Sequence, residues 1–220
     1  MIGQIVVAGG RSVRRELRAI AGYRAVAATP SPTLDRALRR LSRSADRSLL
    51  WLSIAAALAT RPGAPRRAAV RGVRSILATS ATVNLGVKTL LPRARPDRHG
   101  ASVPADRHAR MPDSGSFPSG HSASAFAFAG TVGRELPWAS LPLHLLAAAV
   151  AYSRVHTGVH FPADAIVGGL TGAAIGAAIG AATSTATGAA APAARSRPGR
   201  RVERHGPALE PAHPVVIPPR

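Results

Sequence analysis

Three short runs of the sequence place cationic side chains next to groups that can donate or transfer a proton. The first is KTLLPRARP, at residues 88–96, where a helix end meets a proline-broken turn. Lys88 offers a compact charge and Arg93 and Arg95 offer planar forks, which together can hold the oxygens of a phosphoryl group. A lysine and arginines that flank a membrane segment give the same pattern, so this run alone leaves both interpretations open.

The second run is FPSGHS, at residues 117–122. Pro118 and Gly120 shape a tight turn into the helix predicted after them, and the first N–H groups of a helix have no internal partner and bind anions. Ser119 adds a hydroxyl donor, and His121 can change its protonation near neutral pH. The alternative is a serine that caps the helix, followed by a histidine without a chemical role.

The third run is SRVHTGVHFPAD, at residues 153–164. Pro162 fits the first turn of a long predicted helix, which places His160 at the helix start and Asp164 about one turn further on. Positions i and i+4 share a face, so the carboxylate can hold one imidazole nitrogen and leave the other free as a nucleophile or base. A capping histidine with a solvated aspartate is disfavoured, because the acid lies beside 30 residues without charge.

Five apolar segments must position these runs: 48–60, 75–91, 114–133, 136–153 and 165–194. A membrane-spanning helix needs roughly 18 to 20 apolar residues, so the last segment is the clearest candidate. The first two are short and need flanking Arg or Lys side chains that reach towards the headgroups. Each run lies at the edge of a segment, so we expect all three in one layer at a membrane surface.

The last segment has a glycine at every fourth position: Gly168, Gly172, Gly176 and Gly180. This spacing lets another helix approach closely within a bilayer. A flexible linker is the alternative, but Ile166, Val167 and Leu170 interleave with the glycines, and linkers seldom carry such residues.

Charge and composition narrow the classes of protein. The 220 residues carry 29 Lys and Arg against 10 Asp and Glu, a formal charge of +19, and there is no cysteine. Disulfides, thiol catalysis, iron–sulfur clusters and cysteine-ligated zinc are therefore excluded. The charge fits either nucleic acid or anionic lipid, but aromatic residues are only 4%, and no nucleic-acid-binding signature is present. We therefore expect a membrane as partner and no nucleic acid.

The two ends of the chain differ from its centre. Residues 34–50 place Leu34, Leu38, Leu41 and Ala45 on one helical face and arginines on the others, which predicts an amphipathic helix on the membrane surface. An ordinary solvated helix is the alternative. We divide the chain into a basic segment at 1–33, a membrane domain at 34–190 and a Pro/Arg-rich tail at 191–220, which we expect to be disordered.

In order, the runs read KxxxxxxRP, PSGH and SRxxxxxHxxxD. This resembles the three-part signature of the type 2 phosphatidic acid phosphatase superfamily, PAP2, which also includes bacterial acid phosphatases and vanadium-dependent haloperoxidases. All eleven fixed positions of the signature match: Lys88, Arg95, Pro96, Pro118, Ser119, Gly120, His121, Ser153, Arg154, His160 and Asp164.

The resemblance implies a role for eight of the matched residues. His160 would attack phosphorus and become a phosphohistidine, Asp164 would orient it, and His121 would protonate the leaving oxygen. The phosphate would be held by three cations, a hydroxyl and a backbone amide: Lys88, Arg95, Arg154, Ser119 and Gly120. Three cations and neutral donors supply the stabilisation that a metal often gives, so we expect neither metal nor cofactor.

We therefore expect an all-α integral membrane bundle of about five transmembrane helices with an N-terminal amphipathic helix, in the cell membrane. Membrane members of the family commonly have six spans, so the topology departs from the pattern. The expected activity is hydrolysis of a lipid phosphomonoester or diphosphate. Phosphatidic acid, phosphatidylglycerophosphate, polyprenyl diphosphate and phosphorylated polyprenyl sugars all remain open as substrates. The alternatives are a lipid phosphotransferase and a soluble acid phosphatase or haloperoxidase with the same pocket, and the oligomeric state is also open.

Overall fold

The structure is a computed structural model of the 220-residue chain, and it describes residues 21, 23–26, 32–91, 93–101 and 103–189. Nearly all of the basic segment 1–33 and all of the tail 191–220 lie outside these ranges. The expectations of a basic N-terminal segment and a disordered tail therefore stay predictions.

Every regular element in the described ranges is helical, which confirms the all-α class. The longer helices are α2 (Pro32–Ser44), α3 (Leu49–Ala59), α4 (Ala64–Ala81), α6 (Gly120–Glu135), α7 (Pro137–His156) and α8 (Pro162–Ala189). Short helical turns join them: η1 (Asp46–Ser48), η2 (Thr82–Val87, a π-helix), α5 (Lys88–Leu90) and η3 (Ala105–Arg107).

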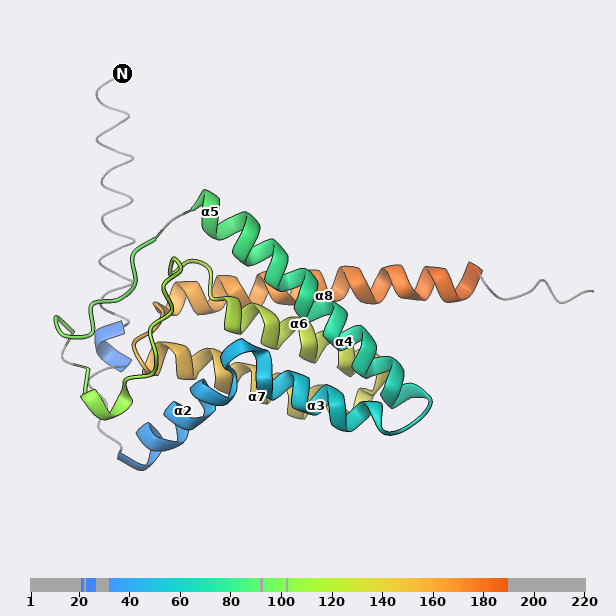
Figure 1. The fold of residues 1–220 in the computed structure, drawn as a ribbon, viewed down its shortest axis with the longest axis horizontal. Coiled ribbons are helices and arrows are strands. Elements are labelled where there is room, and N and C mark those ends of the chain that lie inside the picture. The colour runs from blue at the N-terminus through green and yellow to red at the C-terminus, as the bar shows by residue number, and fades with distance from the viewer. Residues whose placement is uncertain (1–20, 22, 27–31, 92, 102, 190–220) are drawn as a thin grey trace, which may run out of the picture.

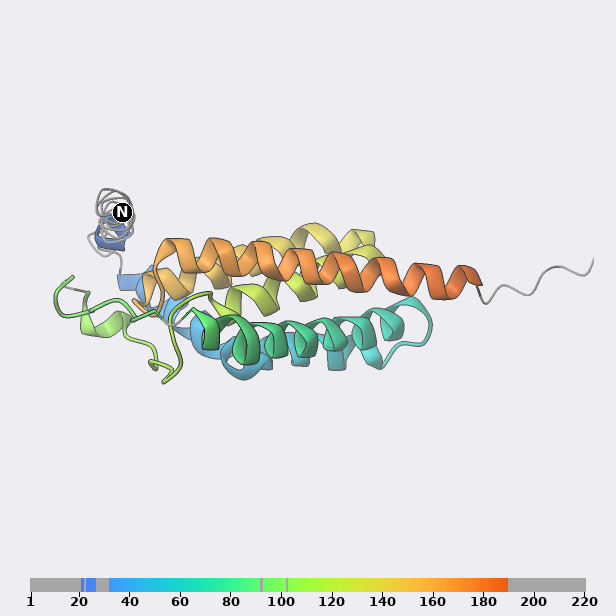
Figure 2. The same cartoon turned by 90° about the horizontal axis from the view of Figure 1, so that it is seen from above.

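The helices form an elongated bundle in which α6 is the central element and packs against α4, α7 and α8 (Figures 1 and 2). The start of α6, the end of α7 and the start of α8 lie at one end of the bundle, together with the long loop between α5 and α6. The α3–α4 turn lies at the opposite end. All three polar runs therefore meet at a single end.

Small side chains allow α8 to lie directly against the α6 backbone. A Cβ added at Gly172 would be 1.9 Å from the Ala123 carbonyl oxygen, and one at Gly168 would be 2.4 Å from the Ser119 oxygen. Only glycine fits at such distances. The close helix approach predicted from the glycine spacing is therefore confirmed, and it fixes α8 relative to the start of α6.

Two segment boundaries differ from the sequence prediction. The helix of the second predicted segment, α4, begins at Ala64 and not at residue 75. It includes Arg66, Arg67, Arg71 and Arg74. The third begins at Gly120, not at residue 114, because Ser119 caps it by accepting a bond from the Ser122 N–H. By length and hydropathy, one helix in the described ranges could cross a membrane: Pro162–Ala182, 21 residues with mean hydropathy 1.7.

The predicted amphipathic helix at 34–50 is interrupted. The structure ends α2 at Ser44, and the chain then bends where Arg47 (φ 52°) and Ser48 (φ 60°) adopt left-handed backbone conformations. α2 packs against α7 and η3, and its buried residues include Asp35 as well as Leu38, while Leu34 is 40% exposed. The face of α2 that carries Asp35 and Leu38 is therefore packed against the bundle.

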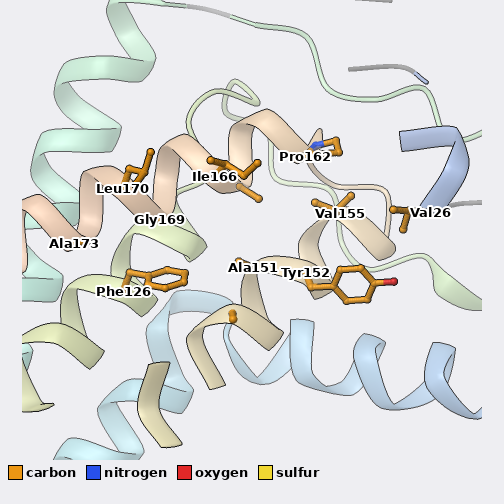
Figure 3. Close-up of a pocket in the computed structure, with 12 residues that line it drawn as sticks. Val26, Phe126, Ala151, Tyr152, Val155, Pro162, Ile166, Gly169, Leu170 and Ala173 are labelled. Atoms are coloured by element: carbon orange, nitrogen blue, oxygen red, sulfur yellow. The ribbon is translucent and has the colours of Figure 1, made fainter. Parts of the chain in front are cut away.

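An apolar groove of about 520 Å³ lies along α7 and α8 (Figure 3). Its lining includes Phe126, Tyr152, Val155, Ile166 and Leu170. None of the predicted site residues lines it. The groove and the polar end of the bundle are therefore separate features.

Candidate active site

The polar end of the bundle brings the predicted site residues together from four parts of the chain. α5 and the loop after it supply two cations, the start of α6 supplies three residues, the end of α7 supplies one, and the turn into α8 supplies the His–Asp pair. In that order they are Lys88, Arg95, Ser119, Gly120, His121, Arg154, His160 and Asp164.

The pair His160 and Asp164 is almost fully enclosed, with exposed fractions of 1% and 0%. The His160 Nδ1 atom lies 3.7 Å from Asp164 Oδ2, so the carboxylate faces that nitrogen. The other ring nitrogen, Nε2, lies 3.4 Å from a terminal nitrogen of Arg95. This orientation directs Nε2 towards the cationic part of the site.

Burial lowers the pKa of His160 to about 3, with the charges of Arg95 and Arg154 acting in the same direction and Asp164 opposing them. The imidazole is therefore neutral at physiological pH. A neutral imidazole keeps a lone pair on one nitrogen, which a nucleophile or base requires.

Asp164 is held in place by three further groups. It forms a 2.7 Å ion pair with Arg93, accepts a 3.0 Å hydrogen bond from the Phe161 N–H, and accepts one from the Ser116 hydroxyl. Such outer partners fix the orientation of a carboxylate that supports a histidine. Arg93, whose fork the first run offered for a phosphoryl group, instead pairs with Asp164, and no pattern in the sequence pointed to Ser116.

Arg95 is fixed by carbonyl oxygens rather than by acids. Its guanidinium donates to Ser114, Gly115 and Val159 at 3.0, 3.2 and 2.9 Å. The Lys88 ammonium donates to the Ser114 hydroxyl at 3.1 Å, and lies 3.9 Å from where a Gly120 Cβ would be. Both cations are therefore held beside the start of α6, whose unpaired N–H groups favour an anion.

Arg154 is the most enclosed of the three predicted phosphate-binding cations, with an exposed fraction of 0%. One terminal nitrogen donates to the Ser42 hydroxyl at 2.7 Å, the Ser42 carbonyl at 3.2 Å and Asp46 at 3.2 Å. Its Nε and other terminal nitrogen have no hydrogen-bond partner within the described part of the chain. Buried donors without partners are costly, and a bound anion would satisfy them.

His121 lies on the side of the site that opens into a cavity of about 470 Å³. Its Nε2 atom is 3.1 Å from Asp46 Oδ1. Burial acts to raise the pKa of the Asp46 carboxyl, but the hydrogen bond with His121 and the charge of Arg154 outweigh it, so the pKa lies below its usual range. The contact therefore joins an ionised carboxylate to the second histidine.

Asp46 and Ser42 could not be found from local patterns, because 108 and 112 residues separate them from Arg154. His156, the other histidine of the third run, lies 2.7 Å from Asp35, which also pairs with Arg107 at 2.9 Å. This buried cluster anchors α2 to α7.

Comparison with known proteins decides the family. The family model described as the PAP2 superfamily matches residues 70–187. The chain belongs to the PAP2 superfamily. This confirms the resemblance carried by the three runs, all of which lie within the matched residues.

Curated PAP2 relatives are similar over much of their length. The chain is 34% identical over 140 residues to "Decaprenylphosphoryl-5-phosphoribose phosphatase" of Mycobacterium tuberculosis (strain CDC 1551 / Oshkosh), an alignment that spans 62% of this chain and 73% of the relative. It is 34% identical over 135 residues to the protein of the same name from Mycolicibacterium smegmatis, spanning 59% and 68%. The family and these names identify the chain as a phosphatase.

Two solved PAP2 structures share the fold. A transmembrane PAP2 type phosphatidylglycerolphosphate phosphatase from Bacillus subtilis superposes with a TM-score of 0.64 at 20% identity, covering 83% of this chain and 92% of that one. LpxE of Aquifex aeolicus superposes with a TM-score of 0.56 at 27% identity, covering 71% and 91%. The helical bundle is therefore a PAP2 phosphatase fold.

Proposed function

We propose that this PAP2 phosphatase is an integral membrane enzyme that hydrolyses a lipid phosphomonoester or diphosphate through a phosphohistidine, without a metal. The observation that carries the proposal is the orientation of His160. Asp164 faces its Nδ1 atom, and Nε2 lies 3.4 Å from a terminal nitrogen of Arg95. A nucleophile, its supporting carboxylate and an anion-binding group thus share one enclosed site.

In the first step, Nε2 of His160 attacks phosphorus. The N–P bond forms as the P–O bond to the lipid breaks, and the electron pair goes to the leaving oxygen, which takes a proton from His121. Asp164 stabilises the positive charge on the His160 ring through its Nδ1–H. The cations and the donors at Ser119 and Gly120 stabilise the charge on the equatorial oxygens.

In the second step, water attacks the phosphohistidine. His121, now neutral, takes a proton from this water as the new P–O bond forms and the N–P bond breaks. The electron pair returns to His160 Nε2, and inorganic phosphate leaves. Both histidines are then in their starting protonation states, as a catalytic cycle requires.

The membrane assignment is supported by the outer faces of the helices. Large apolar side chains are exposed on α4, α7 and α8, among them Leu77 (64%), Leu141 (69%) and Leu170 (67%). Extended exposed apolar surface marks contact with lipid or protein. We propose that α3, α4, α6, α7 and α8 all cross the bilayer within a domain at 34–190, and α3, with 11 residues, relies on flanking arginines that reach towards the headgroups.

The substrate class that we favour is a polyprenyl-linked sugar phosphate. The support is similarity: two relatives at 34% identity are named for such a phosphatase. The test is phosphate release by the detergent-purified protein in excess EDTA, with polyprenyl-linked sugar phosphates, polyprenyl diphosphate, phosphatidic acid and phosphatidylglycerophosphate compared. We expect release without added metal, highest for the polyprenyl-linked sugar phosphate, and loss of all of it in His160→Ala but not in the exposed control His99→Ala. Activity that EDTA abolishes and Mg²⁺ restores would contradict the mechanism.

The roles of the two histidines can be distinguished by varying the leaving group of the substrate. His160→Ala removes the covalent step and should abolish turnover of every substrate. His121→Ala should lower kcat/KM for a lipid alkyl phosphate by about 10²- to 10⁴-fold. The loss should be much smaller for p-nitrophenyl phosphate, whose leaving group needs little protonation. Equal losses on both substrates in His121→Ala would refute its role as the general acid.

A further inference from the structure

Asp46 lies outside the three sequence runs and outside the residues matched by the family model, yet it contacts two of the predicted site residues. Its Oδ1 atom is 3.1 Å from His121 Nε2 and 3.2 Å from an Arg154 nitrogen. It also lines the cavity of about 470 Å³ that opens beside His121. The site therefore contains a second His–carboxylate pair, formed by residues that are 75 positions apart.

The backbone around Asp46 is shaped to make this contact. Ala45, before Asp46, is only 1% exposed. The two residues after Asp46 have φ angles of 52° and 60°, although neither is glycine. Left-handed conformations in such residues cost free energy, and they persist where surrounding structure holds them, often at functional sites. This bend between α2 and α3 turns Asp46 towards the first turn of α6.

We infer that Asp46 is a positioning residue for His121: it fixes the imidazole ring through Nε2 and keeps on that ring the proton that the leaving oxygen receives. The inference rests on the proposed phosphatase mechanism. With Nε2 held by the carboxylate, Nδ1 is the nitrogen that donates. When the P–O bond breaks, the Nδ1 proton moves to the leaving oxygen, and the neutral ring keeps its Nε2–H on Asp46.

The charges around His121 make this carboxylate necessary. Burial of His121 disfavours its protonated ring, and the charges of Arg154 on α7 and Lys88 on α5 act in the same direction. The hydrogen bond and the charge of Asp46 have the opposite effect and favour the protonated His121 ring. Without that carboxylate, the ring would face two cations and a phosphate-binding site, and the protonated form that a general acid needs would be depleted.

The structure also permits a competing role. Because Asp46 accepts from Arg154, its carboxylate could compete with the phosphate for that guanidinium and so restrain activity. The two roles predict opposite outcomes: neutralising a positioning residue lowers kcat, whereas neutralising a competitor raises activity and tightens the binding of vanadate, a phosphate analogue.

The experiment compares Asp46→Asn with the wild type, and with Asp113→Asn, an exposed acid that lines the same cavity. Partners that orient a working histidine typically contribute about 10- to 100-fold. We expect Asp46→Asn to lose about that much kcat/KM on a lipid alkyl phosphate, far less on p-nitrophenyl phosphate, with unchanged vanadate inhibition. The alkaline limb of the pH profile should move to lower pH. Asp113→Asn should match the wild type.

A double-mutant cycle separates positioning from a structural role. If Asp46 acts through His121, the combination His121→Ala with Asp46→Asn should be no slower than His121→Ala alone. Additive losses, equal losses on both substrates, or a gain in activity would overturn the inference. Asp46→Glu, which keeps the charge, should recover part of the activity and serves as the readout if Asp46→Asn does not fold.

Failure of this inference is distinguishable from failure of the proposed function. If the wild type releases phosphate, His160→Ala does not and His121→Ala shows the leaving-group effect, the mechanism stands whatever Asp46→Asn does. If the wild type is inactive on every lipid phosphate, or His160→Ala is active, the proposed function fails first.

Discussion

The proposed nucleophile, His160, illustrates how burial adjusts chemistry at the scale of one residue. His160 is enclosed, and the charges of Arg95 and Arg154 add to the effect of burial, so a positive charge on its ring is unfavourable. The same arginines would become favourable partners once a phosphate dianion is bound between them and the ring. In the proposed mechanism, attack on phosphorus begins from this neutral state of the His160 ring.

The pH behaviour of His160 tests this view. An unperturbed histidine protonates near pH 6.5, whereas His160 has a pKa of about 3, so its ring should stay neutral from pH 8 down to about pH 4. Since the folded-state pKa is the lower one, protonation of the unfolded chain reduces the free energy of unfolding as the pH falls below about 6.5. The measurement is the imidazole ¹⁵N chemical shift in histidine-labelled protein, assigned with His160→Asn. A titration midpoint near 6.5 would contradict the enclosed geometry.

At the scale of elements, the contact between α6 and α8 is the one that sets the site. Gly168 lies against the Ser119 carbonyl, and Gly172 lies against that of Ala123. The α8 helix thereby brings Asp164 next to the first turn of α6, where the Ser119 N–H donates to the Asp164 carbonyl at 3.0 Å. A shift of α8 away from α6 would separate the proposed nucleophile, His160, from the turn that we propose binds phosphate.

Alanine substitutions at two glycines test this packing. A Cβ at Gly172 would meet backbone at 1.9 Å, so Gly172→Ala should destabilise the protein by about 1–3 kcal/mol and reduce activity, because a helix backbone must move. Gly130 in α6 has nothing within 4 Å of its added Cβ, so Gly130→Ala should be neutral or stabilising by up to about 1 kcal/mol. The measurement is thermal unfolding in detergent for both variants. Equal Tm values would show that α8 does not need this glycine.

The sequence predicted the helical elements better than their ends, for a physical reason. The predicted segments ended at each charged residue, but the helix α4 continues through four arginines. Their long side chains can extend away from the helix, and two of them pair with Glu135. The His160–Asp164 pair was predictable because both residues lie within one turn. The contacts of Asp46 and Arg93 were not predictable, since their partners are distant in sequence and only folding brings them together.

At the scale of the whole molecule, the two ends of the bundle both carry positive charge. The end away from the site holds Arg61, Arg66 and Arg74, while Glu135 pairs with Arg67 and Arg71. The other end holds the site arginines. Charged ends around a helical body with exposed leucines fit a bundle whose ends lie at opposite membrane surfaces.

The topology can be tested without removing native thiols, because the chain has no cysteine. Single cysteines at Pro62→Cys, in the α3–α4 turn, and at His99→Cys, in the loop before α6, should be labelled by an impermeant maleimide from opposite sides of the membrane. One should react in intact cells and the other only after permeabilisation. Labelling of both from the same side would exclude five crossings.

The hydrogen bonds from Arg154 to Ser42 and Asp46 also determine when the enzyme can begin to work during its own synthesis. Arg154 follows Ser42 by 112 residues and Asp46 by 108 residues. At about 5 to 20 residues per second, the ribosome needs roughly ten seconds to add a stretch of this length. A chain made only as far as α6 carries Lys88, Arg95 and His121, but neither Arg154 nor His160. Under the proposed mechanism, the first turnover therefore waits until the last two helices have been made and have packed against a segment that left the ribosome long before them.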